Sequence, residues 1–544
     1  MSSDGEKSME VARSSDKVFA KFRRDFCCYG LGIFLIFSSF STMMTLQSSV
    51  NIEAGLGVAS IACAYVTAVV SGFSLTPMLI RRFGAKKCIL MGTMFHITYD
   101  LANFYPRYYT LIPTAILIGI AESTIWTCIS IFNAHFGAEY HKIKNHPSKT
   151  VEFFVSRLSG YYFVIHHLHH IFGGVITYLI LNVFNEQHPP SVMSNVSMTG
   201  NSSNFSLYHD VTLSFCGAND CQKKTVIDES IGNYSPDSRI NFMILLSCFT
   251  TMCISSLIIH ACTLPNVKVR HHQESDENAN TIELEKSGIN DSKADILIAT
   301  VGNRDRENSQ TALLENEDDL GLHESLQVEL PGSGKDGVCN GIVANTLKQV
   351  GRQLLIPKQL LIIPITLYTG LLVGYIFSDL PRSFVSCVSG FSTIGIYSCL
   401  YGVGHVISPA ILGKRGKHLG RIVIFSTSMV LDICNFLFCL LWTPNHDTAW
   451  IVYISYVAFG LSDGIWQSTL MVMYTEYFPG RQNVVGATYI SIVCLGIAIN
   501  CGWNTTLCVY MKIYVLLGLL AVGFTLFCIA ERLHRRELEN EQKR

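Results

Sequence analysis

Residues 109–132 read YTLIPTAILIGIAESTIWTCISIF, and this apolar run indicates how the chain folds. It holds one charged residue, Glu122, and is longer than the roughly 20 residues that an α-helix needs to cross a bilayer. Comparable runs recur at 26–46, 58–80, 88–104, 109–132, 157–183, 240–263, 358–378, 390–412, 420–442, 447–472, 484–503 and 509–531. We therefore predict an all-α membrane protein with twelve transmembrane helices.

The composition favours a chain whose solvent is largely lipid. Hydrophobic residues make up 49% of the 544 residues and charged residues 15%, and the mean hydropathy is +0.32. The formal net charge of −1 provides no basic field for phosphates, so nucleic acid is not an expected partner. The 19 cysteines form no C-x-x-C pairs of a zinc site, so we expect neither a metal nor another cofactor. No phosphate-binding glycine loop or H-E-x-x-H motif indicates an enzyme.

Short basic loops predict the orientation. Loops 81–87 and 413–421 each carry four Lys or Arg residues, and such loops face the cytosol. An even number of crossings then places both tails, 1–25 and 532–544, in the cytosol as well.

A long loop at 184–239 is predicted to lie on the opposite side. It contains glycosylation sequons at Asn195, Asn201, Asn204 and Asn233. It also contains Cys216 and Cys221. Because an oxidising compartment permits disulfides, we predict a local bond between these two cysteines, with Cys387 as the alternative partner.

A second long segment, 264–357, divides the chain into an N-terminal half, 26–263, and a C-terminal half, 358–531. It has 16 acidic and 9 basic residues and almost no aromatic ones. This composition is typical of disordered segments, so we predict a solvated acidic linker in the cytosol.

Two short matches relate the halves. Residues 119–126, GIAESTIW, resemble 460–466, GLSDGIW, and residues 100–104, DLANF, resemble 432–436, DICNF. Both matches fall in corresponding helices. They predict two related six-helix halves, which is the parallel-repeat plan of major facilitator transporters.

The same motifs place acids inside the predicted spans. A charge at mid-helix costs about 2.5–3.5 kcal/mol on insertion scales, so each needs a physical reason. One reason is a proton or cation site that lines a cavity. The other is a cross-helix hydrogen bond that only fixes packing. The candidates for this intramembrane polar site are Glu122, Asp463, Asp432 and Asp100.

Residues 166–170 read HHLHH and add histidines to this polar site. In a helix, His166, His169 and His170 share one face and can share a proton or a ligand. Three interpretations remain open: a pH-sensitive polar patch, a passive surface that faces water, and a metal site, for which no further ligand lies nearby in sequence.

The sequence contains six short motifs, at 46–51, 55–60, 103–106, 109–113, 215–221 and 465–467. Together they resemble the Unc-ninety-three family of major-facilitator-like membrane proteins, especially its A-type branch. The resemblance covers about 26–265 and 355–530, outside the N-terminal tail and the linker. The histidine-rich stretch departs from the family pattern, so the resemblance implies no role for it.

The resemblance implies a function. The founding member of the family is a regulatory subunit of a two-pore potassium channel, another branch escorts Toll-like receptors, and A-type members are plasma-membrane glycoproteins. We therefore expect a regulatory subunit or scaffold that modulates a potassium channel and so the membrane potential. We expect it in the plasma membrane, with an endosomal or ER membrane as the alternative. The alternative function is a proton- or cation-coupled secondary transporter of a small solute.

Overall fold

The architecture comes from a computed structural model. Every regular element of the described residues is a helix. The sequons at Asn195, Asn201, Asn204 and Asn233, and most of the linker 264–357, lie outside those residues. The structure describes residues 3–51, 55–144, 151–183, 213, 215–222, 238–267, 348–415, 420–478 and 482–543.

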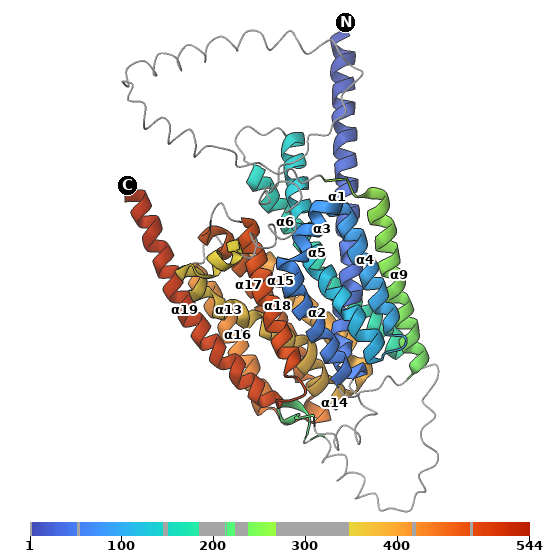
Figure 1. Ribbon diagram of the computed structural model, residues 1–544, viewed down its shortest axis with the longest axis vertical. Coiled ribbons are helices and arrows are strands. Elements are labelled where there is room, and N and C mark those ends of the chain that lie inside the picture. Colours follow the sequence, from blue (N-terminus) through green and yellow to red (C-terminus); the bar gives the residue numbers. More distant parts are fainter. Residues whose placement is uncertain are drawn as a thin grey trace, which may run out of the picture. The chain divides into compact units, whose positions relative to one another are not determined.

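The first half consists of helices (Figure 1). They are α1 (Ser3–Val50), α2 (Leu56–Phe73), α3 (Leu75–Phe83), α4 (Ala85–Ala102), α5 (Tyr108–Lys144), α6 (Val151–Tyr178) with a π-helical extension (Leu179–Val183), and α9 (Arg239–Thr263).

The second half has the same make-up. Its elements are α13 (Pro357–Gly374), two π-helical turns (Tyr375–Asp379 and Pro381–Ser386), α14 (Cys387–Ser389), α15 (Ile394–Arg415), α16 (Arg421–Leu441), α17 (Ile451–Tyr477), α18 (Gln482–Gly502) and α19 (Val509–Lys543).

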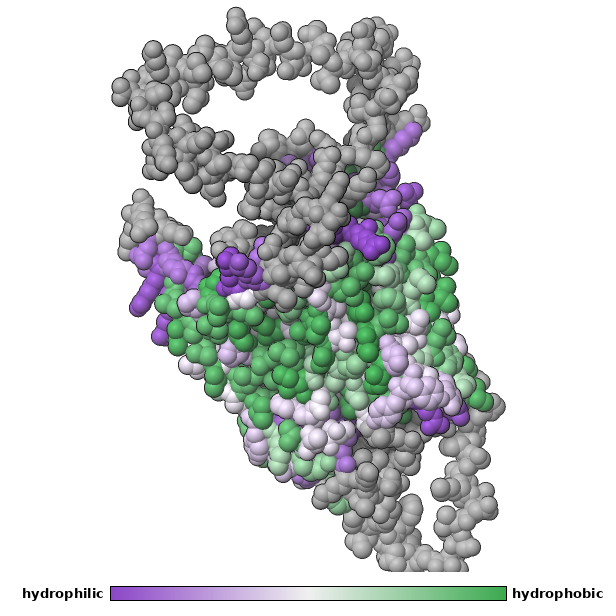
Figure 2. All heavy atoms as spheres, viewed as in Figure 1, coloured by the Kyte–Doolittle hydropathy of each residue, from purple (hydrophilic) through white to green (hydrophobic). Residues whose placement is uncertain are grey.

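The helices are suited to a bilayer. Among the described residues, nine are long and apolar enough to cross a membrane. Helices α4, α15 and α17 fall outside this set, and they carry polar side chains of the interior described below, so the count of twelve crossings stays a prediction. Figure 2 shows, on one face of the molecule, a hydrophobic band over the helices with hydrophilic residues toward their ends.

Several helices continue beyond the predicted spans. Helix α1 begins at Ser3 instead of residue 26, α5 ends at Lys144 instead of 132, and α19 ends at Lys543 instead of 531. Tertiary contacts hold the extensions of α1 and α5 together, because the ring of Phe22 stacks on that of Tyr140 with 5.4 Å between centroids. Apolarity therefore marks the membrane-crossing part of a helix and not its ends.

The two halves pack by the same plan. In the first half, α5 packs against α2 and α4, while α1 packs against α6 and α9. The second half repeats these contacts: α17 packs against α15 and α16, while α13 packs against α18 and α19. Between the halves, α2 contacts α18 and α6 contacts α15, and these two contacts are counterparts under the repeat. The packing therefore supports the predicted relation between the halves.

A glycine in each repeated motif explains part of this correspondence. A Cβ atom on Gly119 of α5 would collide with the backbone oxygen of Ala64 in α2. A Cβ atom on Gly460 of α17 would collide in the same way with the backbone oxygen of Tyr401 in α15. Glycine lets each helix pair approach backbone to backbone, as small residues do in membrane helix pairs.

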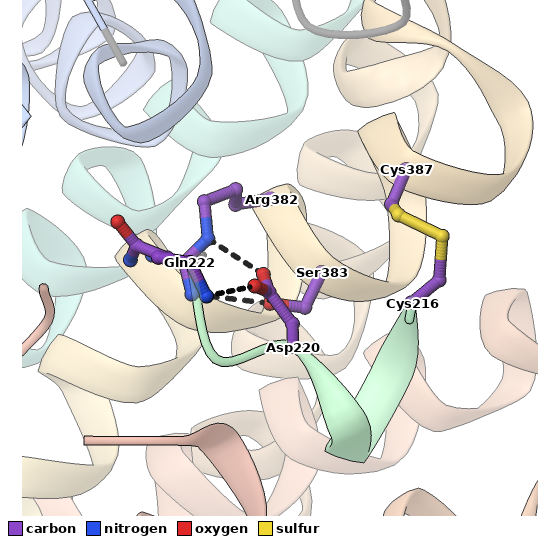
Figure 3. Close-up of a disulfide and its surroundings, with 6 residues drawn as sticks. All are labelled: Cys216, Asp220, Gln222, Arg382, Ser383 and Cys387. Carbon is purple, nitrogen blue, oxygen red and sulfur yellow. Dashed lines mark hydrogen bonds and ion pairs between the residues drawn. A yellow bond between two sulfur atoms is a disulfide. The ribbon is translucent and has the colours of Figure 1, made fainter. Parts of the chain in front are cut away.

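The predicted local disulfide between Cys216 and Cys221 is wrong. Cys216 is bonded to Cys387, the first residue of α14 (Figure 3), which is the alternative partner given above. Cys221 is bonded to Cys508, directly before α19. The physical reason is docking, because Leu213 and Cys216 pack with Cys387 and Val388 in one apolar cluster. The loop of the first half is thereby joined to the second half.

Candidate functional site: a buried histidine and carboxylate cluster

Helix α6 buries the three histidines of the predicted face. His166, His169 and His170 are 4%, 3% and 6% exposed. Their rings are in contact, with 4.7 Å between the centroids of His166 and His169 and 3.9 Å between those of His169 and His170. Since the three rings are covered by protein, the interpretation as a passive water-facing surface does not fit this structure.

Helices α1 and α5 cover one side of the histidines. The hydroxyl of Ser41 on α1 lies 2.9 Å from Nε2 of His169. The ring of Phe37, also on α1, meets the His166 ring edge-on at 4.7 Å between centroids. Trp126 of α5 packs against His166 at 5.3 Å. One side of the cluster is therefore aromatic and belongs to the first half.

Helix α15 supplies a further histidine from the second half. The ring centroid of His405 lies 4.1 Å from that of His167 and 5.8 Å from that of His170. Its Nε2 atom lies 3.7 Å from Oδ2 of Asp463 on α17. The histidines of α6 are thus linked to an acid of the other half across the contact between α6 and α15.

The Asp463 carboxylate receives donors from two helices. Its Oδ2 atom accepts hydrogen bonds from the Tyr401 hydroxyl at 2.5 Å and from Nε2 of Gln467 at 2.8 Å. Within the described part of the chain, its Oδ1 atom has no hydrogen-bond partner. One carboxylate oxygen is therefore fixed by the protein, while the other can accept a proton or a solute group.

Glu122 occupies the corresponding position in the first half. Its Oε2 atom accepts a hydrogen bond from Nε1 of Trp126 at 3.2 Å, so in both halves the acid bonds to the residue one turn later. Nε2 of His96 on α4 lies 3.3 Å from its Oε1 atom. An imidazole therefore lies beside the acid in each half.

Asp432 and Asp100, the other two predicted acids, are held by neighbouring helices. Oδ2 of Asp432 accepts hydrogen bonds from the Tyr368 hydroxyl and from Nε1 of Trp466, both at 2.7 Å. Oδ2 of Asp100 accepts one from Ser39 at 2.9 Å. These contacts fit the packing interpretation, although Oδ1 of Asp432, like that of Asp463, has no hydrogen-bond partner within the described part of the chain.

The cluster contains several polar atoms without a partner. Among the described residues, Nδ1 of His166, His167 and His170 and both ring nitrogens of His405 have no hydrogen-bond partner, although Nε2 of His405 lies 3.7 Å from the Asp463 carboxylate. Buried polar atoms are normally hydrogen-bonded, so water or a small polar solute suits this position. The described residues contain no group of three His, Cys, Asp or Glu side chains that could hold a metal ion. The arrangement can hold and pass protons between imidazoles and Asp463.

Sequence reasoning missed several polar residues of the interior. His96 and His405 are isolated in their apolar runs and gave no signal. Lys512 lies within the predicted span 509–531, and the cost of a charge in a membrane span would have identified it. Asp379 and Arg382 lie between the predicted spans 358–378 and 390–412, where a charge gives no such signal.

Comparison with solved structures identifies the fold. The chain resembles a D-xylose-proton symporter with a TM-score of 0.53 and 9% identity, over 93% of this chain and 96% of that one. It also resembles a bacterial homologue of human peptide transporters, with a TM-score of 0.51 and 10% identity over 96% and 99% of the two chains. The predicted major facilitator architecture is therefore confirmed.

Comparison with known sequences identifies the family. The chain is 26% identical to unc-93 homolog A of Xenopus laevis, over 93% of this chain and 92% of that protein. It is 23% identical to the human homolog A, over 93% of both. It is 21% identical to unc-93 of Caenorhabditis elegans, whose name refers to potassium channel regulation, over 92% of this chain and 60% of that protein. The model of the ion channel regulatory protein UNC-93 matches residues 48–530. The chain belongs to the UNC-93 family.

Proposed function

We propose that the protein is a regulatory subunit of a two-pore potassium channel in the plasma membrane. The observation that carries this proposal is the match of residues 48–530 to a family described as ion channel regulators. The relative from Caenorhabditis elegans, named for potassium channel regulation, aligns over 92% of the chain. In this proposal both termini face the cytosol, as the basic loops predict.

The regulator acts through helix contacts within the bilayer. The exposed side chains of α9 include Ile240, Ile244, Ile254 and Ile258, which offer an apolar helix surface to a channel subunit. The acidic linker is not needed for this contact. Deleting residues 275–340 is therefore expected to leave channel modulation intact.

A specific observation favours a second function, a proton-coupled carrier. His170 and His405 lie at the contact between α6 and α15, and Asp463 of α17 lies beside His405. Ring nitrogens and a carboxylate oxygen of these residues have no hydrogen-bond partner within the described residues. Such groups suit a site at which a proton and a solute are exchanged. The fold, which is shared with a proton symporter, is compatible with this function.

One experiment separates the two functions. A two-pore potassium channel is co-expressed with the wild-type chain or with the Glu122→Gln/Asp463→Asn variant, and potassium current and tracer uptake are recorded together. Amides keep the shape and most hydrogen bonds of the acids but do not exchange a proton. Asp447→Asn, at an exposed position between α16 and α17, is the control.

If the protein is a regulator, the wild type and the Glu122→Gln/Asp463→Asn variant should both change the potassium current, and neither should take up solute. If the protein is a carrier, only the wild type and the control should take up solute, and the potassium current should not change. This result would overturn the proposal that the protein is a regulator.

A further inference from the structure

A second cluster of buried polar side chains lies near the two disulfides, at one end of the helices. It contains four charged side chains, none of them more than 7% exposed. Asp379 and Arg382 belong to the π-helical turns that follow α13, Lys512 belongs to α19, and Asp220 belongs to the docked loop segment 215–222. None of them takes part in the histidine cluster.

Arg382 is held in place by the second half itself. Its guanidinium donates a hydrogen bond to the side-chain oxygen of Asn504, and its Nη2 lies 3.4 Å from Oδ1 of Asp379. Asn504 is fixed in turn by a 2.8 Å hydrogen bond from its Nδ2 to Ser378. Lys512 donates to Oδ1 of Asp379 at 2.6 Å. The second half therefore supplies two partners of Arg382, Asn504 and Asp379, although Gln222 of the loop segment also donates to the Asn504 backbone oxygen at 2.9 Å.

The loop segment provides the missing negative charge. Without it, this polar cluster holds one anion, Asp379, and two cations, Arg382 and Lys512, which leaves an excess of one positive charge within the cluster. Asp220 brings the sum to zero. Its Oδ2 accepts a hydrogen bond from Nε of Arg382 at 2.9 Å and another from Ser383 at 2.7 Å (Figure 3).

The surroundings of Asp220 are those of a bound carboxylate. Its Oδ1 atom accepts a hydrogen bond from the backbone N–H of Gln222 at 2.9 Å. Burial alone would raise the pKa of Asp220, but the charge of Arg382 and the hydrogen bonds from Ser383 and Gln222 hold the pKa below its ordinary value. The group is therefore ionised at neutral pH.

The segment that carries Asp220 is attached to the second half by contacts other than those of the Asp220 side chain. Disulfides from Cys216 and Cys221 flank the aspartate on both sides, and the backbone N–H of Val509 donates to the Asp220 carbonyl at 3.0 Å. The anchors keep the carboxylate close to its site, at a high effective concentration.

We propose that Arg382 and Ser383 form a binding site for a single carboxylate, which the chain itself fills with Asp220 as a displaceable plug. A small monocarboxylate makes the same two hydrogen bonds and supplies the same charge. The anchored segment excludes such ligands from the wild-type protein, and weakening its attachment makes the site available to them.

The first test uses Asp220→Ala protein purified in detergent, with sodium formate as the probe and sodium chloride at equal ionic strength as the control. Formate should raise the Tm of the variant saturably by at least about 2 °C more than chloride does. The wild type should show no such difference, because Asp220 occupies the site. An equal response of the variant to formate and chloride would overturn the proposal.

A double variant tests the charge argument. Asp220→Ala/Arg382→Gln leaves one buried anion and one buried cation, so it should melt above Asp220→Ala and should not respond to formate. Stabilisation of the double variant by formate would show that the binding site lies elsewhere and would refute the proposal.

A second measurement does not depend on the folding of Asp220→Ala. In a variant with serine at Cys216, Cys221, Cys387 and Cys508, the segment keeps Asp220 but loses its covalent anchors. Added formate should then compete with Asp220 and increase amide hydrogen exchange in residues 216–222, whereas chloride should not. Exchange that does not change at any formate concentration would contradict displacement.

Discussion

At the scale of single residues, the buried acids fall into two kinds. Asp432 receives both of its donors from other side chains in tightly packed positions, Tyr368 and Trp466. Asp463 and Glu122 each bond to a residue one turn later in the same helix and lie beside an imidazole of a neighbouring helix. The first kind ties its helix to two neighbouring helices, and the second has an imidazole with which it can exchange a proton. In both Asp432 and Asp463 the Oδ1 atom has no hydrogen-bond partner among the described residues.

Tyr368→Phe should therefore destabilise the protein. The change removes the hydroxyl that donates to Asp432 in a fully buried position, and a buried acceptor that loses a donor costs about 1–3 kcal/mol. The Tm in detergent should fall, whereas Tyr514→Phe, at a position that is 60% exposed, should leave it unchanged. Equal melting of Tyr368→Phe and wild type would show that this hydrogen bond contributes nothing to the stability.

The free energy of unfolding should depend on pH because Asp220 is ionised in the folded protein. Its pKa in the folded state lies below the ordinary 3.8, so the unfolded chain takes up a proton at a higher pH than the folded chain. The contribution of Asp220 to stability is then complete above pH 3.8 and is lost as the pH falls through the folded pKa. In thermal melts, wild type should exceed Asp220→Asn at neutral pH, and the difference should shrink in acid. A difference that stays constant down to the lowest pH would count against this assignment.

At the scale of elements, the contact between α6 and α15 depends on the absence of side chains. A Cβ atom on Gly174 would lie 2.5 Å from the backbone oxygen of Gly395 and 2.7 Å from the backbone nitrogen of Cys399. Neither backbone atom can move away alone. The contact that holds the histidine cluster therefore requires glycine on α6.

Gly174→Ala should lower the stability, although alanine is the better helix former by about 1 kcal/mol. Overpacking of such a contact costs about 1–3 kcal/mol. Gly160→Ala, on the same helix with nothing within 4 Å of the added Cβ, should leave the Tm unchanged or raise it slightly. Melting of Gly174→Ala at or above the wild-type temperature would refute the close contact.

The sequence predicted the positions of the helices better than it predicted where they end or which cysteines pair. Apolar length is a local property, so the predicted spans fall on helical segments, although the span 58–80 is divided at Ser74 into α2 and α3. The extension of α1 depends on rings of another helix, such as Tyr140, and no local pattern encodes such a contact. The partners of Cys216 and Cys221 were mispredicted for the same reason, because their spacing in sequence says nothing about docking on α14 and α19.

The candidate site was predicted in part. The histidines of α6 and Asp463 were identified from the cost of polar groups in a membrane and from the repeat, and the structure brings them into one cluster. His405 joins them only through the contact between α6 and α15. A single histidine in an apolar run gives no indication of which side chains it will contact in the folded protein.

At the scale of the whole molecule, the matching contacts of the two halves favour an even number of crossings. Epitope tags at residues 5, 300 and 540 should therefore all be inaccessible to antibody on intact cells and accessible after permeabilisation. Enzymatic removal of glycans should shift the gel mobility through the loop 184–239. Staining of the tag at residue 300 on intact cells would contradict the predicted orientation.

The two long-range disulfides turn the chain into closed covalent rings. Both rings, from Cys216 to Cys387 and from Cys221 to Cys508, run through the segment that connects the halves. A single protease cut at an engineered site near residue 300 should therefore yield a two-chain protein that migrates as one species without reductant and as two fragments with it. The variant with four serines should separate without reductant. Two fragments from cut wild type on a non-reducing gel would refute both pairings. If the rings are closed, the halves stay joined one to one after the backbone between them is broken.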